Sequence, residues 1–248
     1  MIRDKNSVNV SVTQWIGKRS RQEDSYAVRH YPGATLTVVC DGMGGHDCGY
    51  LASSTAAEAF VEGFEQASGS VAARLRAALD YANQEVGRQF AERSLFGGTT
   101  LLAVYAGGGV VWWVSVGDSI LALWRHGRLL RLNADHSMRG IYCDFVKCGA
   151  MSEEDAMAHG HALRSAVTGE AIALIDAPPT PYPLLPGDRI ILSSDGADAV
   201  LLPSPPSQAL RELLNTREGN LSAALVEACR QKENPYADNV TILSMDWP

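Results

Sequence analysis

A hairpin that sets two carboxylates opposite each other constrains the fold of this chain most strongly. Residues 25–30 and 35–41 have the apolar and alternating character of strands, and a turn from Tyr31 to Ala34 joins them. If His30 faces Thr35 across that turn, antiparallel pairing keeps the sum of partner numbers at about 65, so Asp24 lies opposite Asp41. Like charges in that position destabilise a sheet, which indicates that a cation belongs between them.

Acidic residues stand at the ends of other predicted strands too. Asp195 ends the apolar run 188–194 and, like Asp41, is followed by glycine, while Asp238 precedes the last predicted strand. Asp41 and Asp195 thus stand at C-terminal ends of strands, whereas Asp24 and Asp238 stand at N-terminal ends. In antiparallel sheets these two kinds of end lie side by side, so the four aspartates converge on one edge. Hard divalent cations such as Mg²⁺ or Mn²⁺ prefer such oxygen ligands, and a binuclear metal site follows as a hypothesis.

Periodicity in the rest of the chain predicts a mixed α+β domain. Three-to-four-residue spacing predicts helices, and alternation or short apolar runs predict strands. The short loops between residues 101 and 132 predict one run of consecutive antiparallel strands. No repeat or linker divides the 248 residues, so a single domain is expected. The expected helices are 49–67, 71–93, 152–160, 208–216 and 221–232, and the further strands are 8–15, 101–105, 110–116, 120–124 and 129–132.

Charge and cysteine content exclude several classes of protein. A net charge of -7 argues against a nucleic-acid-binding surface, and no segment has the roughly 18 apolar residues that span a bilayer, so a cytoplasmic protein without membrane insertion is expected. The five cysteines form no Cys-x-x-Cys pair and predict reduced thiols. None has an arginine six residues later, which removes the simplest signature of a cysteine-based phosphatase. His46-x-Cys48 and His159-x-His161 lack partners at zinc-finger spacing and favour a structural interpretation.

Short motifs occur in a fixed order along almost the whole chain. They are Arg19-Ser20-Arg21-Gln22-Glu23-Asp24, Asp41-Gly42-Met43-Gly44-Gly45-His46, Gly98-Thr99-Thr100, Gly117-Asp118-Ser119, Asp135-His136-Ser137, Ser194-Asp195-Gly196 and Asp238-Asn239-Val240-Thr241. This set resembles the PPM/PP2C family of metal-dependent protein Ser/Thr phosphatases, in its compact bacterial form. The resemblance implies a four-layer α-β-β-α sandwich with two central antiparallel sheets, a single domain over residues 1–248, and a flap at about residues 137–175.

The resemblance also implies a role for each motif residue. Asp41 would bridge two Mg²⁺ or Mn²⁺ ions, with the Gly42 carbonyl on one and Asp195 and Asp238 on the other. Glu23 and Asp24 would hold or orient water on the ions, and Asp118 would bind a third, weaker ion together with Asp195. Arg19 would bind the phosphate, and His46 would act as the general acid. The implied reaction is the hydrolysis of phosphoserine and phosphothreonine by direct attack of a hydroxide that bridges the two ions.

The partners implied by the resemblance are proteins phosphorylated on Ser or Thr, which are substrates of a bacterial Ser/Thr kinase. The chain is expected to be a monomer. Two alternatives stay open: a catalytically silent phosphoprotein-binding module and a phosphoesterase acting on nucleotides or other small molecules. The silent module would have lost metal-binding acids, and none of the key ones is missing. Residues 162–169 differ from the usual end of the family's flap, which leaves substrate preference open.

Overall fold

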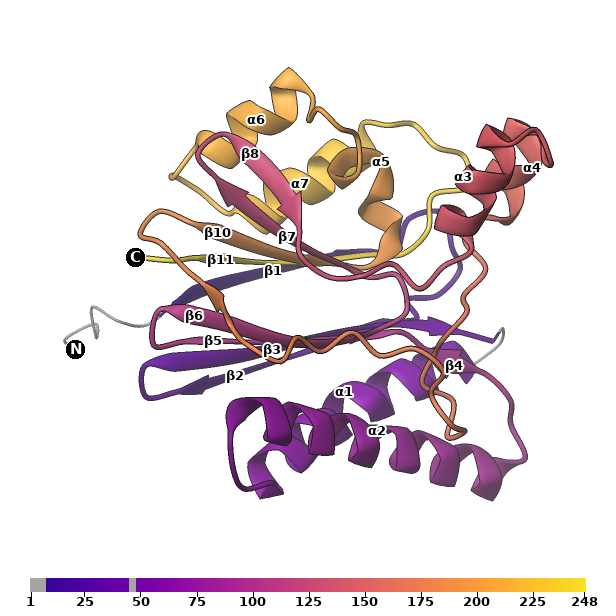
Figure 1. Ribbon diagram of the computed structural model, residues 1–248, viewed down its shortest axis with the longest axis vertical. Helices are drawn as coiled ribbons and strands as arrows, with labels where there is room; N and C mark the ends of the chain where they lie inside the picture. The colour runs from indigo at the N-terminus through magenta and orange to yellow at the C-terminus, as the bar shows by residue number, and fades with distance from the viewer. Residues whose placement is uncertain (1–7, 45–47) are drawn as a thin grey trace.

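Two stacked antiparallel sheets form the centre of the computed structural model, which describes residues 8–44 and 48–248 (Figure 1). One sheet has the order β1-β11-β10-β7-β8, and the other has the order β2-β3-β5-β6-β9, with β4 paired to β3. The strands are β1 (Asn9–Trp15), β2 (Asp24–Tyr31), β3 (Ala34–Met43), β4 (Gly98–Thr99), β5 (Leu101–Gly107), β6 (Val110–Val116), β7 (Ile120–Arg125), β8 (Arg128–Arg131), β9 (Tyr182–Pro183), β10 (Arg189–Ser193) and β11 (Val240–Asp246).

Helices cover both outer faces of the sheet pair (Figure 1). The long helices α1 (Cys48–Gln66) and α2 (Val71–Arg93) pack on the β2-β3-β5-β6 sheet. On the other sheet lie the 3-10 turn η1 (Asp195–Ala197) and helices α5 (Asp198–Leu201), α6 (Gln208–Asn215) and α7 (Leu221–Arg230). The predicted α-β-β-α sandwich is therefore confirmed.

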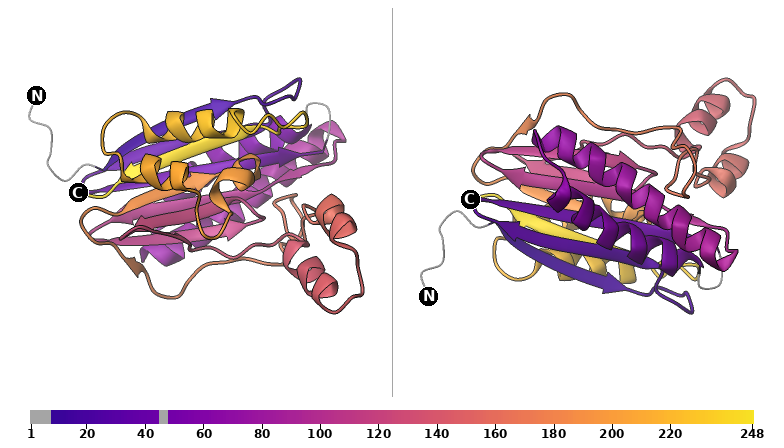
Figure 2. Two further views of the ribbon diagram at one scale, coloured as in Figure 1. Left: turned by 90° about the horizontal axis from the view of Figure 1, so that it is seen from above. Right: turned by 90° about the horizontal axis from the view of Figure 1, so that it is seen from below.

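Two short helices stand outside the sandwich at one end of the molecule. They are α3 (Arg139–Lys147) and α4 (Glu153–His159), and both views of Figure 2 show them projecting past the strand ends, away from the two termini. We call residues 137–175 the flap. No helix among residues 8–44 and 48–248 is long and apolar enough to cross a membrane.

Burial on both faces explains why the central strands are almost continuously apolar. In β3, Val38 and Cys40 pack in the core formed with α1 and α2, whereas Val39 between them packs into the layer between the two sheets. Strands covered on both sides lose the polar-apolar alternation of a half-exposed strand. The sequence pattern therefore located these strands but did not say which sheet each one joins.

The pairing of β2 with β3 confirms the predicted hairpin register. His30 lies opposite Thr35, and Asp24 lies opposite Asp41. The prediction of one continuous antiparallel run over residues 101–132 is wrong, because β6 pairs with β5 whereas β7 pairs with β8 and β10 of the other sheet. Residues 117–119 carry the chain between the sheets. Gly117 adopts φ 102°, and a Cβ there would lie 2.6 Å from Cγ2 of Thr100, so this turn needs glycine.

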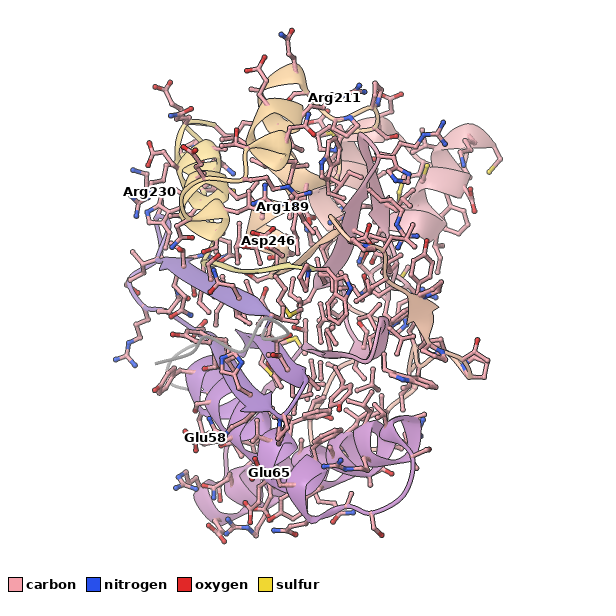
Figure 3. All side chains as sticks on the ribbon, turned by 90° about the vertical axis from the view of Figure 1, so that its left-hand side faces the viewer. Glu58, Glu65, Arg189, Arg211, Arg230 and Asp246 are labelled. Carbon is pink, nitrogen blue, oxygen red and sulfur yellow. The ribbon has the colours of Figure 1, made fainter. Side chains whose placement is uncertain are left out.

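A buried arginine ties α6 to the sheet at the end opposite the flap (Figure 3). Arg189 is 1% exposed, and its Nε donates to Oδ1 of Asp246 over 2.5 Å. Its Nη1 donates to the carbonyl oxygens of Leu214 at 3.0 Å and Thr216 at 2.5 Å, which lie at the end of α6. The guanidinium thus satisfies carbonyl groups that a helix terminus leaves without intrahelical donors.

Candidate metal centre

A cleft of about 390 Å³ opens at the flap end of the sandwich, where the strand ends meet. Glu23, Asp41 and Gly42 come from the hairpin side, Asp195 and Asp238 from the other sheet, and Asp118 from the turn between the sheets. The remaining lining residues are Arg19, Met43, Gly44, Thr100, His161, Ala162, Leu163 and Asn239. The structure thus brings together the predicted site residues that it describes, with Asp24 buried alongside Asp41. His46 lies outside the described residues, and its role stays a prediction.

Asp24 links the two sheets from its place in β2. It is 2% exposed, and its Oδ2 accepts hydrogen bonds from Oγ of Ser194 at 2.8 Å and Oγ1 of Thr241 at 2.7 Å. Ser194 follows β10 and Thr241 lies in β11, so both donors belong to the opposite sheet. Its other oxygen, Oδ1, is buried without a hydrogen-bond partner in the described part of the chain. A lone buried carboxylate oxygen is costly unless a ligand satisfies it.

The backbone of Asp41 is held by a pair of threonines. Its N–H donates to Oγ1 of Thr100 at 3.0 Å, and its carbonyl accepts from the N–H of Thr100 and from Oγ1 of Thr99, each at 2.9 Å. These bonds fix the end of β3 and leave the Asp41 carboxylate on the cleft. A Cβ on the next residue, Gly42, would lie 2.1 Å from the carbonyl oxygen of Gly49, so glycine permits the start of α1 to approach.

Asn239 organises the other side of the cleft. Its Oδ1 accepts from the N–H of Glu23 at 2.7 Å, and its Nδ2 donates to the carbonyl oxygens of Ile16 at 2.8 Å and Arg21 at 2.9 Å. These bonds place the segment between β1 and β2 beside the head of β11. There, Nη2 of Arg19 lies 2.6 Å from Oδ2 of Asp238.

Asp118 reaches the cleft from the turn that joins β6 to β7. The residue is 3% exposed, and its Oδ2 is buried with no hydrogen-bond partner among the residues that the structure describes. The N–H of Gly117 donates to Nδ1 of His136 at 3.2 Å, which holds the turn in place. Asp118 is therefore a second acid with an orphaned oxygen at this end of the molecule.

Burial and mutual repulsion disturb the ionisation of these acids. Burial raises the pKa of Asp24 to about 7. The hydroxyl hydrogen bonds to its carboxylate act in the opposite direction, and the charges of Asp195 and Asp238 add to the rise. Burial and the charge of Asp195 raise the pKa of Asp118 to about 7. Burial and the charge of Asp24 raise the pKa of Asp41 well above its ordinary value. Burial also acts to raise the pKa of Asp195, but the neighbouring His161 and Asp41 side chains outweigh it and lower that pKa.

These residues fit the divalent cations that the sequence predicts. The donors are carboxylate oxygens and one backbone carbonyl, which are the ligands that Mg²⁺ and Mn²⁺ prefer. Two of the buried carboxylates carry an oxygen without a partner in the described residues. A cation supplies both the missing partner and the compensating charge that the raised pKa values call for.

Sequence reasoning missed two residues at or beside this site. His161, at the base of the flap, places its Nδ1 3.7 Å from Oδ2 of Asp195. Arg139, in α3, donates from Nη2 to Asp198 beside η1 and joins the flap to the sandwich. The spacing His159-x-His161 was the available signal, and the structural interpretation set it aside.

Comparison with known proteins gives one family. A family profile described as Protein phosphatase 2C matches residues 13–230. The serine/threonine protein phosphatase PstP of Mycobacterium tuberculosis is 33% identical over 237 residues, which cover 92% of this chain and 42% of PstP. The serine/threonine phosphatase stp of Listeria monocytogenes is 28% identical over 220 residues, covering 85% of this chain and 84% of that protein. The chain therefore spans less than half the length of PstP.

Solved structures show the same architecture. A crystal structure of PstP from M. tuberculosis superimposes with a TM-score of 0.77 at 28% identity, covering 97% of this chain and 98% of that one. The catalytic domain of PstP in complex with two manganese ions gives a TM-score of 0.75 at 29% identity, covering 96% and 97%.

Proposed function

The chain belongs to the protein phosphatase 2C family, and on that premise we propose that it is a Mg²⁺- or Mn²⁺-dependent phosphatase of phosphoserine and phosphothreonine in proteins. The family membership rests on a match over residues 13–230. PstP is more than twice as long as the part that this chain matches. We further propose that residues 1–248 act as one domain whose flap borders the cleft.

One observation carries this proposal: carboxylates from both sheets and from the turn between them meet in one cleft beside an arginine. Asp24 and Asp118 keep orphaned buried oxygens among the described residues, and Arg19 sits at the cleft with its side chain 58% exposed. Structural ion pairs do not need so many acids at one point. A centre for cations next to a guanidinium suits a dianionic phosphate monoester.

The residues of this chain divide the work as follows. Asp41, the Gly42 carbonyl, Asp195 and Asp238 would hold the two core ions, while Glu23 and Asp24 would hold or orient water around them. When bound, such ions neutralise phosphate charge and lower the pKa of a bound water. Arg19 would bind the phosphate oxygens, since its planar donors match them. His46, outside the described residues, is proposed to protonate the departing Ser or Thr oxygen.

We propose that the partners of this chain are phosphorylated proteins in the cytoplasm. The names of PstP and stp describe serine/threonine phosphatases, which supports phosphorylated proteins, targets of a Ser/Thr kinase, as partners of this chain. Cys143 and Cys148 are exposed free thiols, and such thiols persist in a reducing compartment, which supports a cytoplasmic location. We propose a monomer, which light scattering of the purified protein would test.

A direct assay tests the activity. The purified protein is incubated with Mn²⁺ and a phosphothreonine peptide, and phosphate release is measured before and after chelation and for Asp195→Asn. We expect chelation to abolish turnover, and Asp195→Asn to lower kcat/KM at least 100-fold. Asp80→Asn, on the exposed face of α2, is the matched control and should behave like wild type.

The outcomes separate the alternatives. Activity that survives chelation or persists in Asp195→Asn contradicts the proposal. A protein that binds phosphopeptides without turnover is the silent binding module. Faster turnover of nucleotide monophosphates than of phosphopeptides would assign the site to small phosphoesters.

A further inference from the structure

His161 is the one histidine that the described structure sets against the carboxylates of the cleft. It lies just beyond α4, in the flap, and its side chain is 59% exposed. Ligand atoms of Asp118, His161 and Asp195 all lie within 4.8 Å of one another. These residues come from the turn between the sheets, the flap and η1, so the flap completes a cluster that the sandwich begins.

The ligand atoms of this cluster lie nearly as close together as the ligands of one bound ion. Two ligand atoms at about 2.1–2.2 Å from one ion can lie up to about 4.4 Å apart, so small side-chain rotations bring all three atoms onto a common cation. Asp118 is 3% exposed, lines the cleft, and has an oxygen without a partner in the described residues. That orphaned oxygen is independent evidence for a ligand at this point.

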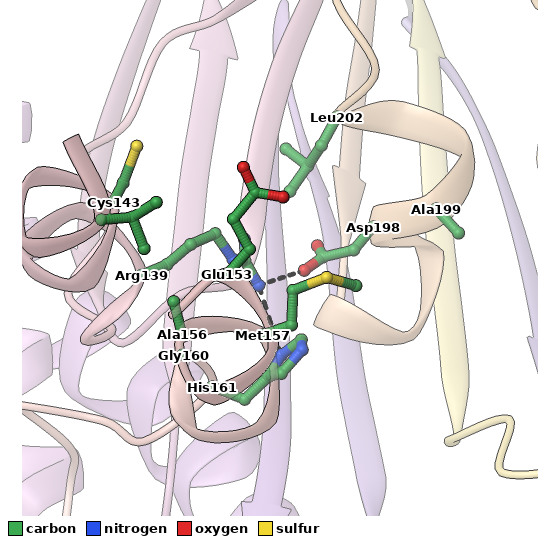
Figure 4. Close-up of a pocket in the computed structure, with 11 residues that line it drawn as sticks. Arg139, Cys143, Glu153, Ala156, Met157, Gly160, His161, Asp198, Ala199 and Leu202 are labelled. Carbon is green, nitrogen blue, oxygen red and sulfur yellow. Dashed lines mark hydrogen bonds and ion pairs between the residues drawn. The ribbon is translucent and has the colours of Figure 1, made fainter. Parts of the chain in front are cut away.

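The contact of His161 with Arg139 suits the form of imidazole that binds metals. Nη2 of Arg139 lies 3.3 Å from its Nδ1, and Figure 4 shows the guanidinium between His161 and Asp198. A guanidinium only donates, so this bond forms when Nδ1 carries a lone pair, whereas a proton on Nδ1 would point to Oδ2 of Asp195, 3.7 Å away. A cation on Nδ1 would replace this bond, and Arg139 would keep its contacts with Asp198 and Asp135.

We propose that His161 is a flap-borne nitrogen ligand that, with Asp118 and Asp195, binds a divalent transition-metal ion beside the two core ions. The resemblance implied a third ion on Asp118 and Asp195 alone, and the added histidine changes its chemistry. Imidazole suits transition metals, whereas Mg²⁺ prefers oxygen, so this position selects Mn²⁺ over Mg²⁺. Binding of this ion also fastens the flap to the sandwich, since His161 is the flap's contribution.

The inference rests on the proposed function only for the neighbouring ions, and its test measures ion binding rather than turnover. The full chain is titrated with Mn²⁺, and uptake is followed by the EPR signal of the free ion. We expect two tighter ions and a third, weaker one. His161→Ala should weaken only the third at least tenfold, which corresponds to about 1.4 kcal/mol. Asp118→Asn should remove the same ion.

Pulsed EPR of the loaded protein identifies the ligand itself. Wild type should show hyperfine coupling of Mn²⁺ to a ¹⁴N nucleus that is lost in His161→Ala. His159→Ala is the matched control, because His159 lies two residues away, is exposed, and bonds to the Asp155 carbonyl of its own helix. It should keep both the third ion and the coupling.

Three results would overturn the proposal. These are a wild-type protein that takes up only two Mn²⁺ ions, a third ion whose affinity is the same in His161→Ala, and a ¹⁴N coupling that persists in that variant. A protein without phosphatase activity that still loses the third ion in His161→Ala would refute the proposed function and leave this inference standing.

Discussion

Replacing Asp24 with asparagine should make the metal-free protein more stable while weakening its response to metal. The amide oxygen of the new side chain would keep the hydrogen bonds from Ser194 and Thr241, and the amide nitrogen would replace the oxygen that has no partner in the described residues. The variant therefore loses no hydrogen bond of the described structure. It loses a buried negative charge that faces Asp41 across the hairpin.

The size of the effect follows from the ionisation of Asp24. Its pKa is raised from 3.8 to about 7, chiefly by burial. Because this carboxyl binds its proton more tightly in the folded state, it lowers the free energy of unfolding as pH rises from 3.8 to about 7. Above that range the free energy of unfolding falls no further on account of this group. At about 1.4 kcal/mol per pH unit, the penalty is about 4 kcal/mol at pH 8 and shrinks to about 1–2 kcal/mol at pH 5. For a chain of this size, about 4 kcal/mol corresponds to a Tm change of roughly 10 °C.

Calorimetry or circular dichroism in a chelator measures this directly. At pH 8 the variant should unfold at a higher temperature than wild type, and the gap should narrow toward pH 5. Added Mn²⁺ should narrow the gap at pH 8, because an ion at 100 times its Kd stabilises the native wild type by about 2.7 kcal/mol, and the variant binds the ion more weakly. Asp80→Asn, at an exposed acid, should stay within about 0.5 kcal/mol of wild type throughout. A variant that unfolds at or below the wild-type temperature in chelator at pH 8 would refute the reasoning.

Arg189→Met should lower the free energy of unfolding in urea by about 3–5 kcal/mol, because Asp246 and carbonyls at the end of α6 lose their donor; a loss no larger than that of exposed Arg88→Ala would contradict this. Gly42→Ala should lower the free energy of unfolding by at least about 2 kcal/mol and weaken Mn²⁺ binding in calorimetric titration, since its Cβ would lie 2.1 Å from a carbonyl oxygen. Gly33→Ala, whose Cβ would have nothing within 4 Å, should lower that free energy by about 1 kcal/mol and leave Mn²⁺ affinity unchanged. Arg19→Ala should raise KM for a phosphothreonine peptide about 10–100-fold with a smaller change in kcat, and an unchanged KM would remove Arg19 from phosphate binding.

The hairpin was predictable because its information is local. A turn of fixed length sets the register, and the register alone puts Asp24 opposite Asp41. Helix α2 was predicted at Val71–Arg93 from its spacing and begins after Ser70, whose side chain accepts from the N–H of Ala73. In both cases the deciding interactions connect residues that are close in the sequence.

The wrong or missing predictions concern strand pairings and side-chain contacts between residues that are far apart in the sequence. The pairing of β7 with β10 rather than β6 depends on a strand about 70 positions away, and both candidate neighbours are apolar on both faces. The bond from the N–H of Glu23 to Asn239 spans 216 positions, and His161 reaches Asp195 only because the flap folds back. Only the folded chain shows such contacts, because no periodicity records them.

The order of strands in the β1-β11-β10 sheet determines when the acidic cluster can assemble during folding. Strand β11 lies between β1 and β10, so the last strand along the sequence occupies an interior place in its sheet. Asp238 and Asn239 stand at its head, and Thr241 within it holds Asp24. During synthesis, the hairpin with Asp24 and Asp41 leaves the ribosome some two hundred residues before these partners do. The growing chain therefore cannot bring all of these acids together until β11 has paired between β1 and β10.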